Sequence, residues 1–136
     1  MKVVLDANVL VSAVIAQGAS HRIVARWLEQ GDLEVVVCPA LLAEVDDVLG
    51  RPRIQKRIEP ELSQLYLATL RRIADVVADP VSVASHTRDP DDDYLVALAR
   101  EHGADYIVTG DKDLLEWPEQ RPPVIAPAVF EQLMGE

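Results

Sequence analysis

Carboxylates are the side chains whose positions in this sequence suggest chemistry. Four of them lie where an apolar run ends or where a helix is expected: Asp6, Glu44, Asp92 and Asp111. Oxygen ligands of this kind, with no His or Cys nearby, favour Mg²⁺ or Mn²⁺ over Zn²⁺. Carboxylates crowded together without a cation repel one another and raise each other's pKa, so we expect a bound metal. Such a metal commonly activates water and stabilises charge on a phosphoryl group.

Buried strands of a parallel sheet are expected to bring these acids together. Apolar runs rich in Val, Ile and Leu predict strands at residues 3–5, 33–38, 105–108 and 124–125, with helices between them. Strands that alternate with helices indicate an α/β fold with a mostly parallel central sheet. Right-handed crossovers place the carboxyl ends of such strands at one edge, where α/β sheets bind their ligands. Asp6 and Asp111 follow two of these strands.

Two helices are predicted after the second strand. Pro39 opens the first, and its apolar face comprises Leu41, Leu42, Val45, Val48 and Leu49, with Glu44 at the edge of that face. Pro60 opens the second, whose predicted apolar stripe comprises Leu62, Leu65, Tyr66, Leu70, Ile73 and Val77 before a break at Asp79 and Pro80. A short edge strand is expected at residues 81–83.

The run of aspartates at residues 91–93 opens a further helix and leaves a choice of acids. On a helical wheel Asp92 shares the inward face with Leu95 and Val96, whereas Asp93 is rotated by about 100°. We therefore interpret Asp92 as the inward carboxylate and Asp91 and Asp93 as mainly capping charges, with Asp93 a possible substitute.

Each acid also has an ordinary structural interpretation. Asp6 and Asp92 could simply cap helices, Glu44 could be a surface acid, and Asp111 could be a turn residue before the next helix. Three polar residues near the same edge, Asn8, Ser12 and Thr109, could orient ligands or water, although caps and turns use the same residue types.

Composition limits the class of protein. The 136 residues suit one domain spanning 1–136, and a hydrophobic content of 49% supplies a sizeable core. We see no signal peptide and no apolar run near the roughly 20 residues that span a bilayer. One cysteine, Cys38, excludes a disulfide within the chain. These features predict a cytoplasmic protein without membrane contact.

The formal net charge of -10 argues against broad binding of nucleic acid through its phosphates. The basic residues are nevertheless clustered, with Arg51, Arg53, Lys56 and Arg57 within a single short segment. This segment is either a solvated surface or a local patch that contacts phosphate.

Four segments together resemble the PIN-domain ribonucleases, and more closely the VapC-like toxins of type II toxin–antitoxin pairs. They are VLDANVL at 4–10 followed by Ser12, PALLAEV at 39–45, DPDDD at 89–93 followed by LVALA at 95–99, and ADYIVTGDKDLL at 104–115. The resemblance extends over nearly the whole chain. In the third segment Asp93 could take the place of Asp92, and in the last Asp113 could reach the metal, although Asp111 is the better match.

This resemblance implies a PIN-like three-layer α/β/α domain that cleaves RNA. Asp6, Glu44, Asp92 and Asp111 would hold one or two Mg²⁺ or Mn²⁺ ions, and metal-activated water would hydrolyse the phosphodiester. Such toxins are usually homodimers that a cognate antitoxin protein inactivates. A non-toxic PIN-type nuclease and a catalytically silent PIN binding module are the alternatives within the same family.

Two other Mg²⁺-binding α/β classes fit the residues less well. A phosphotransfer receiver domain needs an acidic pair after the first strand, where this sequence has Asp6 alone, and a lone phosphoacceptor Asp after the third. A haloacid-dehalogenase-type phosphatase needs an Asp two residues after Asp6, and Asn8 occupies that position.

Overall fold

A parallel five-stranded sheet forms the centre of the computed structural model, which describes residues 1–81, 90–118 and 120–135, with the side chains of 90–92 also outside the description. The strands are β1 (Lys2–Leu5), β2 (Glu34–Val37), β3 (Asp75–Val76), β4 (Tyr106–Val108) and β5 (Val124–Ile125). Their order is β3-β2-β1-β4-β5, and every neighbouring pair is parallel. The predicted α/β class and parallel sheet are confirmed.

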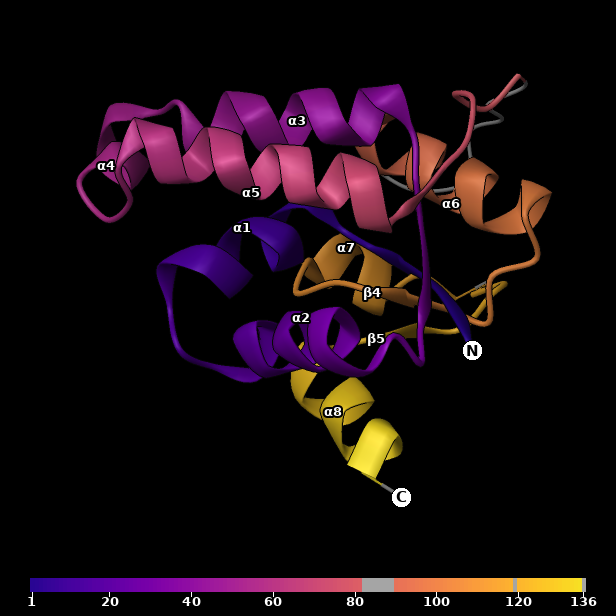
Figure 1. Ribbon diagram of the computed structural model, residues 1–136. Helices are drawn as coiled ribbons and strands as arrows, with labels where there is room; N and C mark the ends of the chain where they lie inside the picture. The colour runs from indigo at the N-terminus through magenta and orange to yellow at the C-terminus, as the bar shows by residue number, and fades with distance from the viewer. Residues whose placement is uncertain (82–89, 119, 136) are drawn as a thin grey trace.

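Helices connect the strands and lie on both sides of the sheet. They are α1 (Ala7–Ile15), α2 (Ala19–Gln30), α3 (Pro39–Leu49), α4 (Pro52–Gln55), α5 (Pro60–Ile73), α6 (Pro90–Glu101), α7 (Lys112–Leu115) and α8 (Pro127–Gly135). In the view of Figure 1, α3, α5 and α6 lie above the strands, and α2 and α8 lie below. Among the described residues, no helix is long and apolar enough to cross a bilayer.

The strand order reverses direction at β1. From β1 the chain moves outward through β2 to β3, and then returns to pair β4 with the other side of β1. In open α/β sheets ligands bind outside the carboxyl ends of the strands at such a switch point. The residues that follow β1 and β4 are Asp6 and Thr109. This pair therefore lies where a sheet of this topology is expected to bind a ligand.

Helix α3 follows the predicted pattern closely. Its five predicted core residues, Leu41, Leu42, Val45, Val48 and Leu49, are all buried. Glu44 is partly buried, as expected for the edge of that face. The first turn of α3 is hydrogen-bonded to a segment distant in sequence: the backbone amide of Ala40 donates to Asp79 Oδ1 at 2.8 Å. The helix that carries Glu44 is therefore held by packing along its length and by a carboxylate at its start.

The predicted stripe of α5 is wrong in part. Its buried residues are Ser63, Leu67 and Leu70, whereas Leu62 and Leu65 are 53% and 64% exposed. Because α5 packs on α3, the buried face is the one directed at that helix. The apolar spacing of Leu62 and Leu65 belongs to a different, solvent-exposed face, and composition alone does not distinguish the two.

The third strand also lies earlier than predicted. Helix α5 ends at Ile73, and residues Asp75–Val76 form β3, where Asp75 and Val76 are in register with Val36 and Val37. The expected strand at 81–83 is not formed at Val81, which lies in a bend and is 95% exposed; residues 82 and 83 lie outside the described residues. A two-residue strand is too short to give a periodic signal.

Candidate active site

Asp6 is a buried carboxylate at the switch point of the sheet. Its side chain is 4% exposed, and Thr109 Oγ1 donates a hydrogen bond to Asp6 Oδ2 at 2.6 Å. Asp6 occupies the residue before α1 but makes no side-chain capping hydrogen bond to that helix. The carboxylate is therefore directed to the end of β4, and capping of α1 does not account for its burial.

The electrostatic surroundings of Asp6 disfavour its negative charge. Burial raises its pKa most strongly, and the charges of Glu44 and Asp111 raise it further. The hydrogen bond from Thr109 and the amide of Ala7 act in the opposite direction, but the pKa remains above its usual value. Three of the predicted acids thus lie close enough to interact, although they come from three separate segments of the chain.

Glu44 has a partner that the sequence did not suggest. Tyr94, on α6, donates from its hydroxyl to Glu44 Oε2 at 2.5 Å, across 50 positions in the sequence. Burial raises the pKa of Tyr94, and the negative charges of Glu44 and Asp6 raise it further. The phenol consequently keeps its proton and remains a hydrogen-bond donor to the carboxylate.

Thr109 also connects Asp6 to Asp111. Its side-chain oxygen accepts a hydrogen bond from the Asp111 amide at 3.0 Å while donating to Asp6. Asp111 in turn precedes α7, and its Oδ1 accepts from the amide of Asp113 at 2.9 Å. The structural role considered for Asp111, a turn residue before a helix, is therefore present, and Asp111 interacts electrostatically with Asp6 as well.

Of the aspartates at the start of α6, the structure describes the side chain of Asp93. The Asp91 and Asp92 side chains lie outside the described residues, so the position predicted for Asp92 remains a prediction. Asp93 is 4% exposed, although the helical wheel rotates it away from the inward face; its capping role stays a prediction. Leu95 and Val96, which the wheel places on the inward face, are buried. The whole run from Leu95 to Ala99 is buried as well, and α6 packs against both β1 and β4.

The donor set suits a hard divalent cation. Asp6, Glu44 and Asp111 offer carboxylate oxygens, and the pKa of Asp6 is raised first by burial and then by the charges of Glu44 and Asp111. Among the residues whose side chains are described, no group of three or more acidic, His or Cys side chains is already arranged around one point. One oxygen of Glu44 accepts the hydrogen bond from Tyr94.

The remaining polar candidates are less enclosed. Asn8 is exposed and Ser12 is partly buried. All four basic residues, Arg51, Arg53, Lys56 and Arg57, are exposed, and Arg51 pairs with Asp47 at 3.3 Å.

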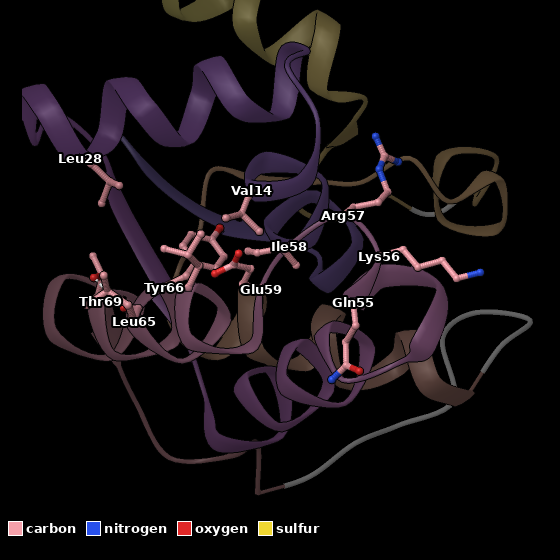
Figure 2. Close-up of a pocket in the computed structure, with 11 residues that line it drawn as sticks. Val14, Leu28, Gln55, Lys56, Arg57, Ile58, Glu59, Leu65, Tyr66 and Thr69 are labelled. Atoms are coloured by element: carbon pink, nitrogen blue, oxygen red, sulfur yellow. Dashed lines mark hydrogen bonds between the residues drawn. The ribbon is translucent and has the colours of Figure 1, made fainter.

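A cavity of about 590 Å³ lies apart from the acids, and Lys56 and Arg57 line it together with apolar residues such as Leu28, Leu65 and Tyr66. Figure 2 shows Lys56 and Arg57 at one end of this cavity, and Leu28, Leu65 and Thr69 at the other. None of the acids Asp6, Glu44 and Asp111 lines it. The cavity therefore belongs to a surface separate from the acidic cluster.

Sequence reasoning missed two residues, Tyr94 and Asp79. Tyr94 lies directly after the aspartate run, but the sequence at that position is equally consistent with a tyrosine that only packs in the core. The sequence predicts a helix break at Asp79, and the structure shows that its carboxylate accepts a hydrogen bond from the first turn of α3. Neither contact has a local sequence signal, because each joins segments about 40 to 50 residues apart.

The chain belongs to the PIN domain family, whose model matches residues 2–113. This confirms the resemblance noted in the sequence, and PIN domains are generally nucleases that use divalent metal ions. A receiver domain and a haloacid-dehalogenase-type phosphatase are thereby excluded. A comparison with curated proteins finds no match.

Solved structures show the same fold at low sequence identity. PAE2754 from Pyrobaculum aerophilum is 17% identical with a TM-score of 0.66, over 100% of this chain and 91% of that one. VapBC2 from Rickettsia felis, bound to a DNA fragment from its promoter, is 12% identical with a TM-score of 0.60, over 92% and 97%. FitAcB from Neisseria gonorrhoeae is 20% identical with a TM-score of 0.54, over 93% and 98%.

Proposed function

We propose that this chain is a divalent-metal-dependent endoribonuclease and the toxin of a toxin–antitoxin pair. The observation that carries the nuclease proposal is the burial of Asp6 at the switch point, with the charges of Glu44 and Asp111 close enough to raise its pKa. An isolated structural aspartate has no need of two further acids beside it. Membership of the PIN family supplies the class of reaction.

Asp6, Glu44 and Asp111 are the proposed ligands of Mg²⁺ or Mn²⁺, together with an acid from the start of α6. Asp92 is the candidate from the sequence, and the burial of Asp93 supports Asp93 as an equal candidate. The bound metal would supply water activation and charge stabilisation at the scissile phosphate. Thr109 fixes the orientation of Asp6 and the backbone of Asp111 through its two hydrogen bonds.

The toxin role rests on the structural neighbours. Two of them, VapBC2 and FitAcB, are toxin–antitoxin complexes, and by analogy we propose a cognate antitoxin protein and a homodimer for this chain. We also propose that the exposed basic residues Arg51, Arg53, Lys56 and Arg57 contact RNA phosphates, because their charge opposes that of the rest of the chain.

Purified protein incubated with mixed RNA tests the nuclease proposal. Wild-type protein should cleave RNA with Mg²⁺ or Mn²⁺ but not with EDTA, and Asp6→Asn should abolish cleavage. Asp92→Asn and Asp93→Asn, compared side by side, identify the acid from α6. Cleavage that persists in EDTA, or an Asp6→Asn variant as active as wild type, would sink the proposed mechanism.

Induced expression in a bacterial host tests the toxin role separately. Wild-type protein should arrest growth, co-expression of the neighbouring gene product should relieve the arrest, and Asp6→Asn should be harmless. Absence of arrest by a protein that cleaves RNA in vitro would identify a non-toxic nuclease of the same family.

A further inference from the structure

Tyr94 packs against the hydrophobic core and also places a polar group at the acidic cluster. It lies on α6 next to the buried Asp93, is itself partly buried, and places its hydroxyl 2.5 Å from Glu44 Oε2. The charges of both Glu44 and Asp6 act on this hydroxyl. The phenol therefore lies at the acidic cluster, bonded to the carboxylate of Glu44 on α3 and close enough to interact with Asp6 at the end of β1.

Glu44 needs an external constraint if it is to bind a metal with a defined geometry. It is partly buried at the edge of the α3 core face, and its flexible side chain could otherwise rotate into solvent. A single hydrogen bond to Oε2 removes that freedom and leaves Oε1 with its lone pairs available. Hydrogen bonds of this kind to ligating carboxylates orient the ligand and contribute to metal affinity.

We infer that Tyr94 is a positioning residue, which holds the Glu44 carboxylate at the metal site through the hydrogen bond from its hydroxyl. The inference rests on the proposed function, because it assigns Tyr94 a task at the same site. Tyr94 acts through Glu44 and does not itself ligate the cation. Its substitution should therefore weaken the site without removing a ligand.

Tyr66 provides a matched control in the same chain. Like Tyr94 it is partly buried, and its hydroxyl donates a hydrogen bond of similar length, 2.6 Å, to the carbonyl of Leu10. Burial raises its pKa as well, so it is also a neutral donor. Its acceptor is a backbone carbonyl of α1, and its loss leaves the hydrogen bonds of Asp6, Glu44 and Asp111 in place.

Calorimetric titration of metal-free protein with Mn²⁺ tests the inference, with urea unfolding of each variant in EDTA as the measure of stability. Tyr94→Phe should weaken Mn²⁺ binding by about 10- to 100-fold. Tyr66→Phe should bind Mn²⁺ as wild type does, even if both variants lose similar stability. That pattern separates positioning of Glu44 from a general structural effect.

Two results would overturn the inference: Tyr94→Phe that binds Mn²⁺ as tightly as wild type, or Tyr66→Phe that loses affinity to the same extent. Failure of the proposed function is recognised differently, because wild-type protein would then bind no Mn²⁺ at all. The titration measures binding alone, so its result is independent of any RNA substrate.

Discussion

Thr109 and Asp6 are joined by a 2.6 Å hydrogen bond between residues that follow neighbouring parallel strands. Thr109 is fully buried and Asp6 is 4% exposed, so this bond forms away from solvent. The same Thr109 oxygen accepts from the amide of Asp111. One hydroxyl group thus organises two of the proposed metal ligands, and its removal should affect both stability and activity.

Thr109→Val removes that hydroxyl while keeping the branched shape of the side chain. The Asp6 carboxylate and the Asp111 amide each lose a partner, so the free energy of unfolding should fall by about 1–3 kcal/mol. RNA cleavage should fall by about 10- to 100-fold, because Asp6 is no longer oriented. Urea unfolding and a cleavage assay measure the two effects.

Thr69→Val is the matched control for this substitution. The Thr69 hydroxyl donates to the Leu65 carbonyl within α5 at 2.9 Å, away from the acids, and Thr69 is partly exposed. Thr and Val have similar helix propensities, so stability should change by less than about 0.5 kcal/mol. Equal losses of activity in the two variants would contradict the role assigned to Thr109.

The raised pKa of Asp6 predicts how stability depends on pH in EDTA. The folded state binds the Asp6 proton more tightly than the unfolded state does, because the pKa of Asp6 is raised by folding from about 3.8 in the unfolded chain. The Asp6 contribution to the free energy of unfolding therefore falls as pH rises from 3.8 through the folded pKa, and it is constant above that. Asp6→Asn should remove this component and be at least as stable as wild type at neutral pH.

Urea unfolding of wild type and Asp6→Asn at a series of pH values checks this expectation. The difference between the two proteins should grow with rising pH in favour of the variant. Parallel curves, with no pH dependence in the difference, would show that Asp6 is not held in an unfavourable environment. Loss of cleavage together with retained or increased stability is the expected signature of a functional acid.

Asp79→Ala tests how the start of α3 is held. Asp79 Oδ1 accepts the Ala40 amide at 2.8 Å and also lies near Cys38, whose pKa rises to about 11 through burial and the Asp79 carboxylate. Loss of a capping acceptor should lower the free energy of unfolding by about 0.5–2 kcal/mol. Asp46→Ala, an exposed acid on the same helix, should cause no such loss in the same urea titration.

The basic segment is tested through the salt dependence of RNA binding. If Lys56 and Arg57 both contact phosphates, replacing both with Ala should reduce the slope of log affinity against log salt by about 1.4 for single-stranded RNA. Binding should be measured in Asp6→Asn protein, which leaves the RNA intact. The control pair, Arg71→Ala with Arg72→Ala, removes two exposed charges from the end of α5 and should leave the slope unchanged.

The sequence is most informative where one periodicity determines the structure. The α3 residues predicted to be inward are buried, and Glu44 lies at the edge of their face, because α3 has a polar side and an apolar side. In α6 the residues predicted to be inward, Leu95 and Val96, are buried too, but burial of the whole run 95–99 means that the wheel alone did not predict the burial of Asp93. In α5 apolar residues lie on more than one face of the helix. Packing against α3 buries Leu67 together with Leu70, the second of which was predicted.

The sequence predicted that Asp6 and Asp111 lie at one edge of the sheet, but not which partners they have. That β1 and β4, the strands before these acids, are neighbours in the sheet is a finding of the structure. The contacts of Tyr94 with Glu44 and of Asp79 with Ala40 depend on how α6 and the segment after β3 lie against α3. Such contacts follow from the assembled structure, and no local spacing rule anticipates them.

Titration of the protein with Mn²⁺ in wild type and in three single variants tests the central claim most directly. If Asp6, Glu44 and Asp111 form one cation site, Asp6→Asn, Glu44→Gln and Asp111→Asn should each weaken Mn²⁺ binding, while Asp46→Asn should not. Mn²⁺ binding that none of the three substitutions alters would contradict the account.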